Sequence, residues 1–504
     1  MKRTIALMLA LFMVAPMAVA CGKEEEETKQ ETQDTGISTE SGTETEETVK
    51  ETPNWDAVDK TSLNGMTVDI YGGNETNQEV LRLDFEGYTS DILEDGIYDR
   101  NRLIENELDC KINVYYAEGS KDFFKTVVNS GDGSMDLAVL NSGTLVPEGI
   151  ALPFEYIESL DMTQPWWDQA LMKDMKICGM SYFAHLDFMF HHYDDMHVVF
   201  YNKKMLDKYQ LEDPYDLHKN EQWTIEKFIE LIEVATQDTN GDGLMGEDDD
   251  YGVYMKGSEG MPMIHASGLH MVSWDDDQGT MVLNMVKERY VNILEAITPI
   301  YNPMGISQLN FEGNSTEISQ QVYVAFNKGN IMFLADSLGA CQDLRSVEDN
   351  YGLIMCPRYD YAETPIVGVA GRAFMLPKDI GDDNGDGVDD FDQVGQFLQA
   401  VGAYTHDMLI DVYIEKNIIG KGLRDERSVE MFYEMIQYRG SELCVWYFQS
   451  YGFSTTVNAQ TDVLWGTGVG YASAAQTHLK KFNLMAKRLV EKVQEQVDKL
   501  GIVQ

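Results

Sequence analysis

The sequence has 504 residues, of which 43% are hydrophobic and 11% aromatic, so it can build more than one folded core. Its 85 acidic residues outnumber 38 Lys and Arg, and the formal net charge is -47. Because such a charge repels polyanions at long range, the composition excludes nucleic acid as a partner.

The first 20 residues have the features of a signal peptide: two basic residues, then an apolar run interrupted by Pro16. That run is too short and too broken for a comfortable membrane span. It ends in Ala-Val-Ala directly before Cys21, which resembles the lipobox where bacterial lipoproteins are cleaved and acylated. The resemblance implies a lipidated Cys21 and a protein anchored to the outer face of the cell membrane. Plain secretion after cleavage at Ala-x-Ala is the alternative.

Residues 21–62 consist mainly of Glu, Thr, Ser and Gln, with few side chains that a core could bury. Such a segment cannot offset the entropy lost on ordering. We therefore expect a disordered acidic linker between the anchor and the folded part.

The remaining cysteines and histidines show no zinc or disulfide pattern. An odd number of cysteines without close pairs argues against a disulfide framework or a zinc site and favours buried thiols. The stretch "HHYDDMH" at 191–197 matches no zinc spacing, and we expect it to be a solvated loop. The cysteines beyond Cys21 are Cys110, Cys178, Cys341, Cys356 and Cys444.

Strands and helices alternate along the rest of the chain. That order is typical of mostly parallel sheets covered by helices, and the number of strands favours two α/β lobes. We place one lobe at 63–198, continued by about 362–410, and the other at 199–361, continued by about 411–504. Hydrophobic periodicity predicts strands at 66–72, 110–116, 135–143, 197–203, 251–255, 321–326, 329–336 and 368–378, and helices at 91–108, 121–131, 224–237, 285–301 and 477–500.

One stretch carries a family resemblance. A strand ends in Tyr201-Asn202-Lys203, a turn contains Pro214, Trp223-Thr224 begins a helix, and an acidic loop from Asp238 closes on Tyr251-Gly252. In this order the segments resemble the family 1 extracellular solute-binding proteins, and weaker agreement extends over residues 64 to 500. The resemblance implies a two-lobed clamshell of the type II periplasmic-binding-protein kind. It also implies a monomer without catalytic activity that binds a carbohydrate between its lobes and delivers it to the permease subunits of an ABC importer.

A sugar site needs aromatic faces for C–H stacking and planar polar groups for the hydroxyls. Adjacent side chains such as Trp166 and Trp167 are not expected to face one core, although packing of both is the alternative. Trp274 is either a stacking surface or an exposed anchor in the loop at 267–279. Asp336 and Arg372, and Asn141 with them, equally suit structural ion pairs, whereas the resemblance implies a ligand contact for Asp187. The candidate ligand-binding residues are Asn141, Trp166, Trp167, Asp187, Trp274, Asp336 and Arg372.

Two acidic loops have the ligand spacing of a calcium-binding EF-hand loop. The first offers Asp238, Asn240, Asp242, the Leu244 carbonyl and Asp249. The second offers Asp382, Asn384, Asp386, the Val388 carbonyl and Asp390. A predicted helix precedes the first loop and a predicted strand follows it, so an ion there would be a structural staple rather than a sensor. Asn-Gly and Asp-Gly turns without an ion are the alternative.

We therefore expect an exported, lipid-anchored carbohydrate-binding protein of an ABC importer. Two other functions stay open. One is a secreted carbohydrate-active enzyme, because the sequence contains many carboxylates whose separation depends on the fold. The other is a calcium-dependent surface interaction protein.

Overall fold

The computed structural model describes most of the chain beyond the predicted linker. The signal peptide, Cys21, the linker as far as residue 53, Asn384 and Asp386 lie outside the described residues. Among the described helices, none combines the length and the apolar character needed to cross a bilayer. The described ranges are 54–246, 248–255, 260–301, 315–344, 350–369, 371–382, 387–447 and 471–502.

The last part of the predicted linker is folded. Asn54 begins a short helix, α2 (Asn54–Ala57), and its Nδ2 donates to Asp407 Oδ1 at 2.7 Å. The backbone N–H of Trp55 donates to the other oxygen of Asp407, and its ring packs edge-on against Tyr404. The expectation of disorder up to residue 62 is therefore wrong for residues 54–62, because Trp55 supplies an apolar surface that the polar composition hides.

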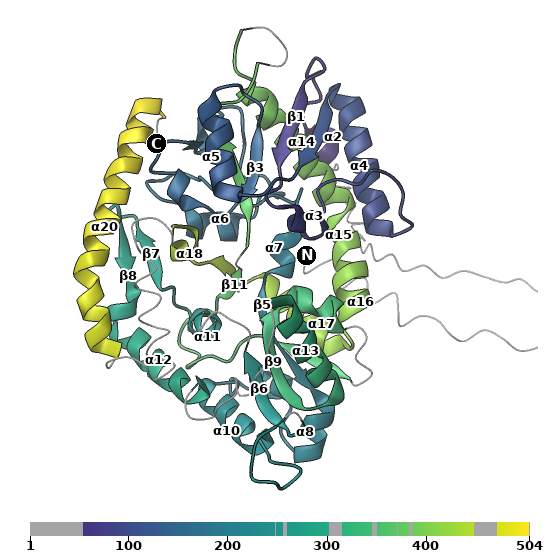
Figure 1. Cartoon of the computed structure of the whole chain (residues 1–504), viewed down its shortest axis with the longest axis vertical. Helices are drawn as coiled ribbons and strands as arrows, with labels where there is room; N and C mark the ends of the chain where they lie inside the picture. The colour runs from purple at the N-terminus through teal and green to yellow at the C-terminus, as the bar shows by residue number, and fades with distance from the viewer. Residues whose placement is uncertain are drawn as a thin grey trace, which may run out of the picture. The chain divides into compact units, whose positions relative to one another are not determined.

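The first sheet has five strands in the order β2-β1-β3-β12-β4. β2 and β3 run parallel to β1, whereas β12 runs antiparallel to β3. Figure 1 shows the helices α4, α5 and α14 around this sheet. The elements are β1 (Thr67–Tyr71), β2 (Lys111–Tyr115), β3 (Leu137–Leu140), β4 (Ala151–Leu152), β12 (Ala373–Pro377), α4 (Ile92–Leu108), α5 (Ser120–Ser130) and α14 (Phe391–Met408).

The helix α4 shows how local sequence fixes an element. Asp91 caps it by accepting hydrogen bonds from the backbone N–H groups of Leu93 and Glu94. Its apolar residues recur every three or four positions, and Ile97 and Ile104 are fully buried. The helix ends where Asp109 takes a left-handed conformation at φ 51°. The helix expected at 91–108 is thus confirmed.

The second sheet has four strands in the order β10-β5-β9-β6. β9 is antiparallel to β5 and parallel to β6, so the sheet is mixed. α10 packs on β6, and α17 packs on β10. The elements are β5 (His197–Asn202), β6 (Tyr251–Met255), β9 (Ile331–Ser337), β10 (Tyr351–Ile354), α8 (Lys203–Tyr209), α10 (Ile225–Ala235), α12 (Glu288–Tyr301), α13 (Ser315–Lys328) and α17 (Glu426–Ile436).

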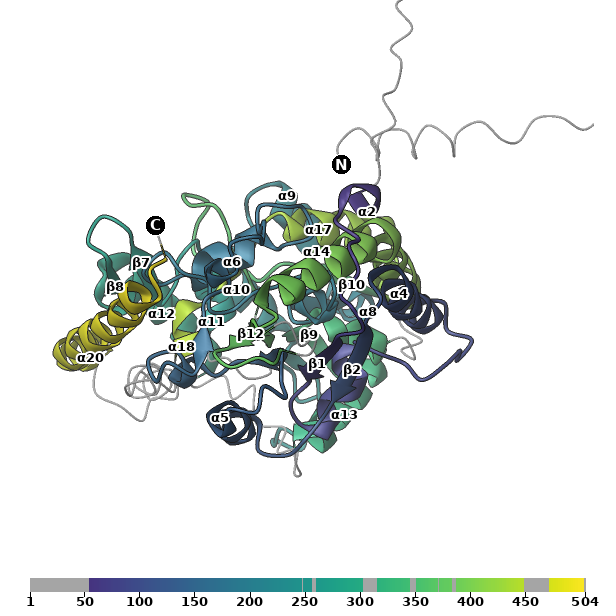
Figure 2. The same ribbon diagram turned by 90° about the horizontal axis from the view of Figure 1, so that it is seen from above.

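A third set of elements belongs to neither of these sheets. A bridge between Met196 and Val369 joins the start of β5 to β11, which pairs in parallel with β13. We call β11, β13 and residues 184–197 the junction. Seen from above, the hairpin β7–β8 lies beside α20 (Figure 2). The elements are β7 (Val272–Asp275), β8 (Thr280–Leu283), β11 (Val367–Val369), β13 (Arg439–Ser441), α6 (Gln169–Met175), α7 (His191–Asp194), α11 (Met261–Ala266) and α20 (Tyr471–Leu500).

Two sequence expectations about strands are wrong. The segment 368–378 is not one strand but two, because Gly371 between β11 and β12 has φ 112°, a conformation that interrupts a strand. A Cβ there would lie 1.8 Å from Asp195 Oδ2. The segment 321–326 belongs to the helix α13: Val322 and Phe326 are buried four residues apart, which is helical spacing.

The five cysteines of the described chain are free and buried, as expected. Burial raises the pKa of the Cys110 thiol and of the Cys356 thiol to about 12. These side chains therefore serve as apolar core residues.

Candidate functional site

Charged side chains pair in the buried part of the junction. Arg439 Nη1 lies 3.0 Å from Asp168 Oδ2, and Asp187 Oδ2 lies 2.6 Å from His406 Nδ1. Between these pairs lies His192, whose Nε2 is 3.9 Å from both Asp168 Oδ2 and Asp187 Oδ1. Pairing of this kind is required where charge is removed from water.

Asp187, predicted as a ligand contact, is therefore engaged within the protein. It is 6% exposed, and its backbone N–H donates to the Trp166 carbonyl at 3.0 Å. Its hydrogen bond with His406 raises the pKa of that imidazole. The geometry is that of a structural ion pair, and a direct role toward a ligand stays a prediction.

Trp166 and Trp167 are both buried, with exposed fractions of 4% and 2%. Both indole Nε1 atoms donate to Gln399 Oε1 on α14, at 2.7 and 3.2 Å. The expectation that adjacent side chains cannot face one core is wrong, because a turn from Gln164 to Trp167 lets both rings reach the same helix. The ring of Trp166 also packs against Gly402, where a Cβ would approach it to 2.5 Å.

The segment 191–197 is mostly buried rather than solvated, and none of its residues is exposed. His191 Nε2 lies 2.9 Å from Asp195 Oδ2, and His192 is 1% exposed. Burial lowers the pKa of His197 to about 4, so this imidazole is neutral at physiological pH. The polar composition of this segment concealed its position, because the segment leads into β5 and its Met196 bridges Val369 of β11.

Trp274 lies on β7, not in a loop, and lines a hollow of about 190 Å³. The hollow is smaller than the roughly 300–1,000 Å³ of most ligand pockets. It brings Trp274 together with polar residues that the sequence did not single out. They include Lys173, Asp174, His270 and Ser441.

The structure brings Asn141 and Arg372 together. Leu140 pairs with Ala373, so the exposed Asn141 and the half-buried Arg372 extend from the same end of the β3–β12 pair. Asp336 lies elsewhere, on β9, where it accepts a hydrogen bond from Tyr323 Oη at 2.9 Å. Asp336 is the penultimate residue of its strand.

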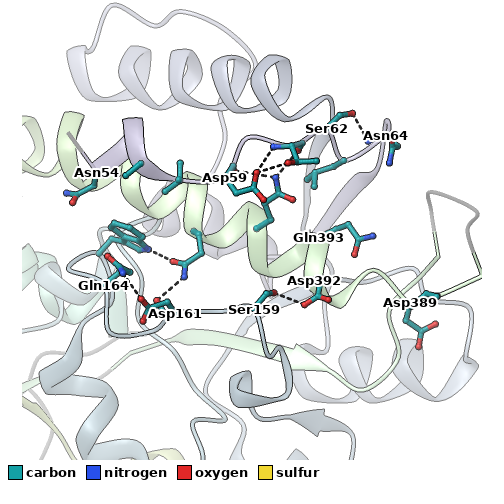
Figure 3. A pocket seen from close by; sticks show the side chains of 18 residues that line it. Asn54, Asp59, Ser62, Asn64, Ser159, Asp161, Gln164, Asp389, Asp392 and Gln393 are labelled. Carbon is teal, nitrogen blue, oxygen red and sulfur yellow. Dashed lines mark hydrogen bonds between the residues drawn. The ribbon is translucent and has the colours of Figure 1, made fainter. Parts of the chain in front are cut away.

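A larger hollow of about 810 Å³ lies between the N-terminal segment 54–64, residues 159–166 and α14 (Figure 3). Its polar walls are held by hydrogen bonds: Ser159 donates to Asp392 at 2.6 Å, and Gln399 Nε2 donates to the Asp161 carbonyl at 2.9 Å. The residues that line it include no Lys or Arg. Of the predicted site residues, it includes Trp166 and Val388.

The first acidic loop is closed by its own side chains. Asp238 accepts hydrogen bonds from the N–H groups of Gly241 and Gly243, at 2.6 and 2.8 Å. Asp249 accepts from Thr239 at 2.8 Å and from Gly246 at 2.7 Å, and the bond from Gly246 is the main cause of its lowered pKa. The loop lies between α10 and β6, as expected.

These bonds leave an oxygen-only donor set that suits calcium. Asn240 and Asp242 each accept one N–H two residues ahead, and each oxygen keeps a further lone pair. In the second loop, Asp382 accepts from Gly387 at 2.8 Å, the same bond that Asp238 makes with Gly243. Asp390 is fully buried just before α14.

Functional partners on α14 escaped sequence reasoning. Gln399 binds both indoles and His406 binds Asp187, and these two residues are two helical turns apart on one face of the helix. The seven-residue spacing of Gln399 and His406 can be read from the sequence. Their partners cannot, because these partners are more than 200 positions away.

Comparison with protein-family models and with curated proteins gives no match. Solved structures do match. The sugar-binding protein MalE from Xanthomonas citri aligns with 87% of this chain and all of its own, with a TM-score of 0.55 and 11% identity. An ABC substrate-binding protein from Listeria monocytogenes in complex with cycloalternan covers 87% and 99%, with a TM-score of 0.51 and 12% identity. The GacH receptor of Streptomyces glaucescens covers 84% and 99%, with a TM-score of 0.50 and 15% identity.

The chain has the two-lobed α/β fold of these proteins. The predicted fold class is thereby confirmed, including mixed sheets flanked by helices. All three neighbours are binding proteins rather than enzymes.

Proposed function

We propose that this protein is the carbohydrate-binding lipoprotein of an ABC importer. The supporting observation is a fold shared with sugar-binding proteins over 87% of this chain and the whole length of the Xanthomonas protein. Binding is reversible and takes place between the two lobes, without catalysis. Closure around the sugar then yields the form that the permease subunits recognise.

The ligand we propose is an oligosaccharide. The Listeria and Streptomyces structures were obtained with cycloalternan and with acarbose. In this chain Trp274 offers a partly exposed indole beside the polar side chains of Asp174 and Ser441, which is the combination a sugar ring needs.

The deciding experiment is a thermal-shift screen of the purified protein against mono- and oligosaccharides, with peptides as a second panel. A true ligand at a hundredfold excess over its Kd stabilises the protein by about 2.7 kcal/mol. Recovery of the unaltered sugar after incubation contradicts the enzyme alternative. Stabilisation by peptides alone would contradict a carbohydrate ligand.

The finer features of the proposal have separate tests. Acylation of Cys21 predicts that the exported protein partitions into detergent, and that Cys21→Ser moves it to the aqueous phase. Gel filtration of the purified protein tests the proposed monomer. A calcium-dependent interaction protein would instead show no stabilisation by any small molecule and would lose its partner on chelation.

We also propose that the loop from Asp238 to Asp249 holds a structural calcium ion, and that the loop from Asp382 to Asp390 can hold a second. The carboxylate and carbonyl oxygens there are the donors that calcium prefers. The first loop lies between the helix α10 and the strand β6, so no second helix is present that could move when the ion binds. We therefore propose a structural role for the ion.

A further inference from the structure

Two histidines and a glutamate meet at the junction, apart from the acidic loops. His265 lies at the end of α11, His270 precedes β7, and Glu442 follows β13. One nitrogen or oxygen from each lies within 4.8 Å of the others. The side chains of His265 and Glu442 are 2% exposed, and that of His270 is 18% exposed.

The separations suit three ligands of one ion. His265 Nε2 lies 3.1 Å from Glu442 Oε2, and His270 Nδ1 lies 3.8 Å from the same oxygen. Ligands of a tetrahedral ion with bonds of roughly 2.0–2.1 Å are about 3.4 Å apart, between these two values. A distance of 3.8 Å is too long for a hydrogen bond.

Surrounding groups hold the Glu442 carboxylate in place, and a second carboxylate faces His270. The Glu442 carboxylate accepts hydrogen bonds from the backbone N–H groups of Met271 at 2.7 Å and Val272 at 3.0 Å. Behind His270, Asp174 Oδ2 lies 3.7 Å from Nε2 and accepts the N–H of Ser441. A carboxylate behind a histidine, and a hydrogen-bonded carboxylate ligand, are the usual outer shell of a metal site.

We infer that His265, His270 and Glu442 bind one divalent ion of the zinc class. Two imidazoles and one carboxylate are borderline ligands that suit zinc, cobalt or nickel, whereas calcium and magnesium require oxygen donors. Because His270 and Asp174 line the 190 Å³ hollow, the ion reaches the site from there and keeps a position for water. The ion connects α11 to the end of β13, residues 177 positions apart.

The test measures zinc bound per chain after chelation and dialysis of the purified protein against zinc. We expect one zinc in the wild type, binding weakened about tenfold or more in Asp174→Asn, and a larger loss in His270→Gln. His218→Gln is the matched control, because His218 Nε2 pairs with Glu434 Oε1 at 2.7 Å and no second histidine of the described chain joins them. The inference would be overturned if the wild type bound no zinc, because hydrogen bonds alone would then hold the three side chains together. It would also be overturned if His270→Gln bound zinc as tightly as the wild type.

A second measurement does not depend on a variant that folds. Cobalt bound to the wild type should give the intense visible absorption of a four-coordinate ion. The faint spectrum of six-coordinate cobalt, expected for the oxygen donors of the acidic loops, would contradict the assignment.

Discussion

Asp187 Oδ2 and His406 Nδ1 lie 2.6 Å apart, although 219 positions separate the two residues. The pair connects the segment before α7 to the end of α14. Asp187 is 6% exposed, so the imidazolium is the partner that compensates a carboxylate in the interior.

This ion pair should make stability depend on pH. The folded pKa of His406 is raised above its ordinary 6.5, first by the hydrogen bond to Asp187, so its contribution is present below 6.5 and is lost as pH rises through the folded pKa. The free energies of unfolding of the wild type and of His406→Gln, measured with urea, should therefore differ more at about pH 6 than at about pH 9. The same difference at both pH values would contradict a stabilising ion pair between Asp187 and His406.

The neighbouring His185 should have the opposite dependence. It is fully buried, neither ring nitrogen has a hydrogen-bond partner among the described residues, and burial lowers its pKa to about 4. Between pH 6.5 and 4, His185 is protonated in the unfolded chain but neutral in the folded chain. The free energy of unfolding therefore falls as pH falls through this range. We expect His185→Phe to remove up to about 3 kcal/mol of this acid loss. If the free energy of unfolding falls equally steeply with pH in the wild type and in His185→Phe, then His185 is not the cause of the acid loss.

Substitution of Trp167 should affect stability, whereas substitution of Trp274 should affect ligand binding. Trp167→Ala removes a buried ring that packs against Phe154 and binds Gln399, so it should lower the free energy of unfolding by about 3–5 kcal/mol. Trp274→Ala, at a partly exposed position, should instead weaken binding of a sugar found in the thermal-shift screen about tenfold, or about 1.4 kcal/mol, in calorimetric titration. Normal sugar affinity in Trp274→Ala would remove this indole from the site.

Calcium should act on stability more than on sugar affinity. Chelation should lower the Tm of the wild type, and Asp242→Asn should reduce that response because it removes one charged donor. Asp248→Asn is the matched control, since Asp248 is exposed in the same loop outside the ligand spacing. A larger effect of chelation on sugar affinity than on Tm would favour a sensor.

Local patterns predicted most of the helices and strands. The helix at 91–108 carries its cap and its periodic apolar face in neighbouring residues, so the sequence alone identifies it. The pattern at 321–326 misled, because β-branched residues alternate there while Val322 and Phe326 also fit a helix. Periodicity over six residues does not separate the two structures.

The candidate site was harder to predict than the fold. Trp166 and Asp187 were singled out for a ligand, yet the structure assigns them partners on α14. The sequence did not predict a role for Glu442, because His265 and His270 are more than 170 positions away and no local motif surrounds it. Long-range pairing of this kind depends on the topology, which composition and spacing do not contain.

The buried thiols have a practical consequence. Since Cys110, Cys178, Cys341, Cys356 and Cys444 are all buried, alkylating reagents reach them only when the core opens. When Cys21 is acylated or removed, the rate at which these five thiols are labelled therefore reports the opening of the core without any engineered probe. A cysteine introduced at the exposed Leu244, 73% accessible, would be labelled much faster than these five and could carry a fluorophore.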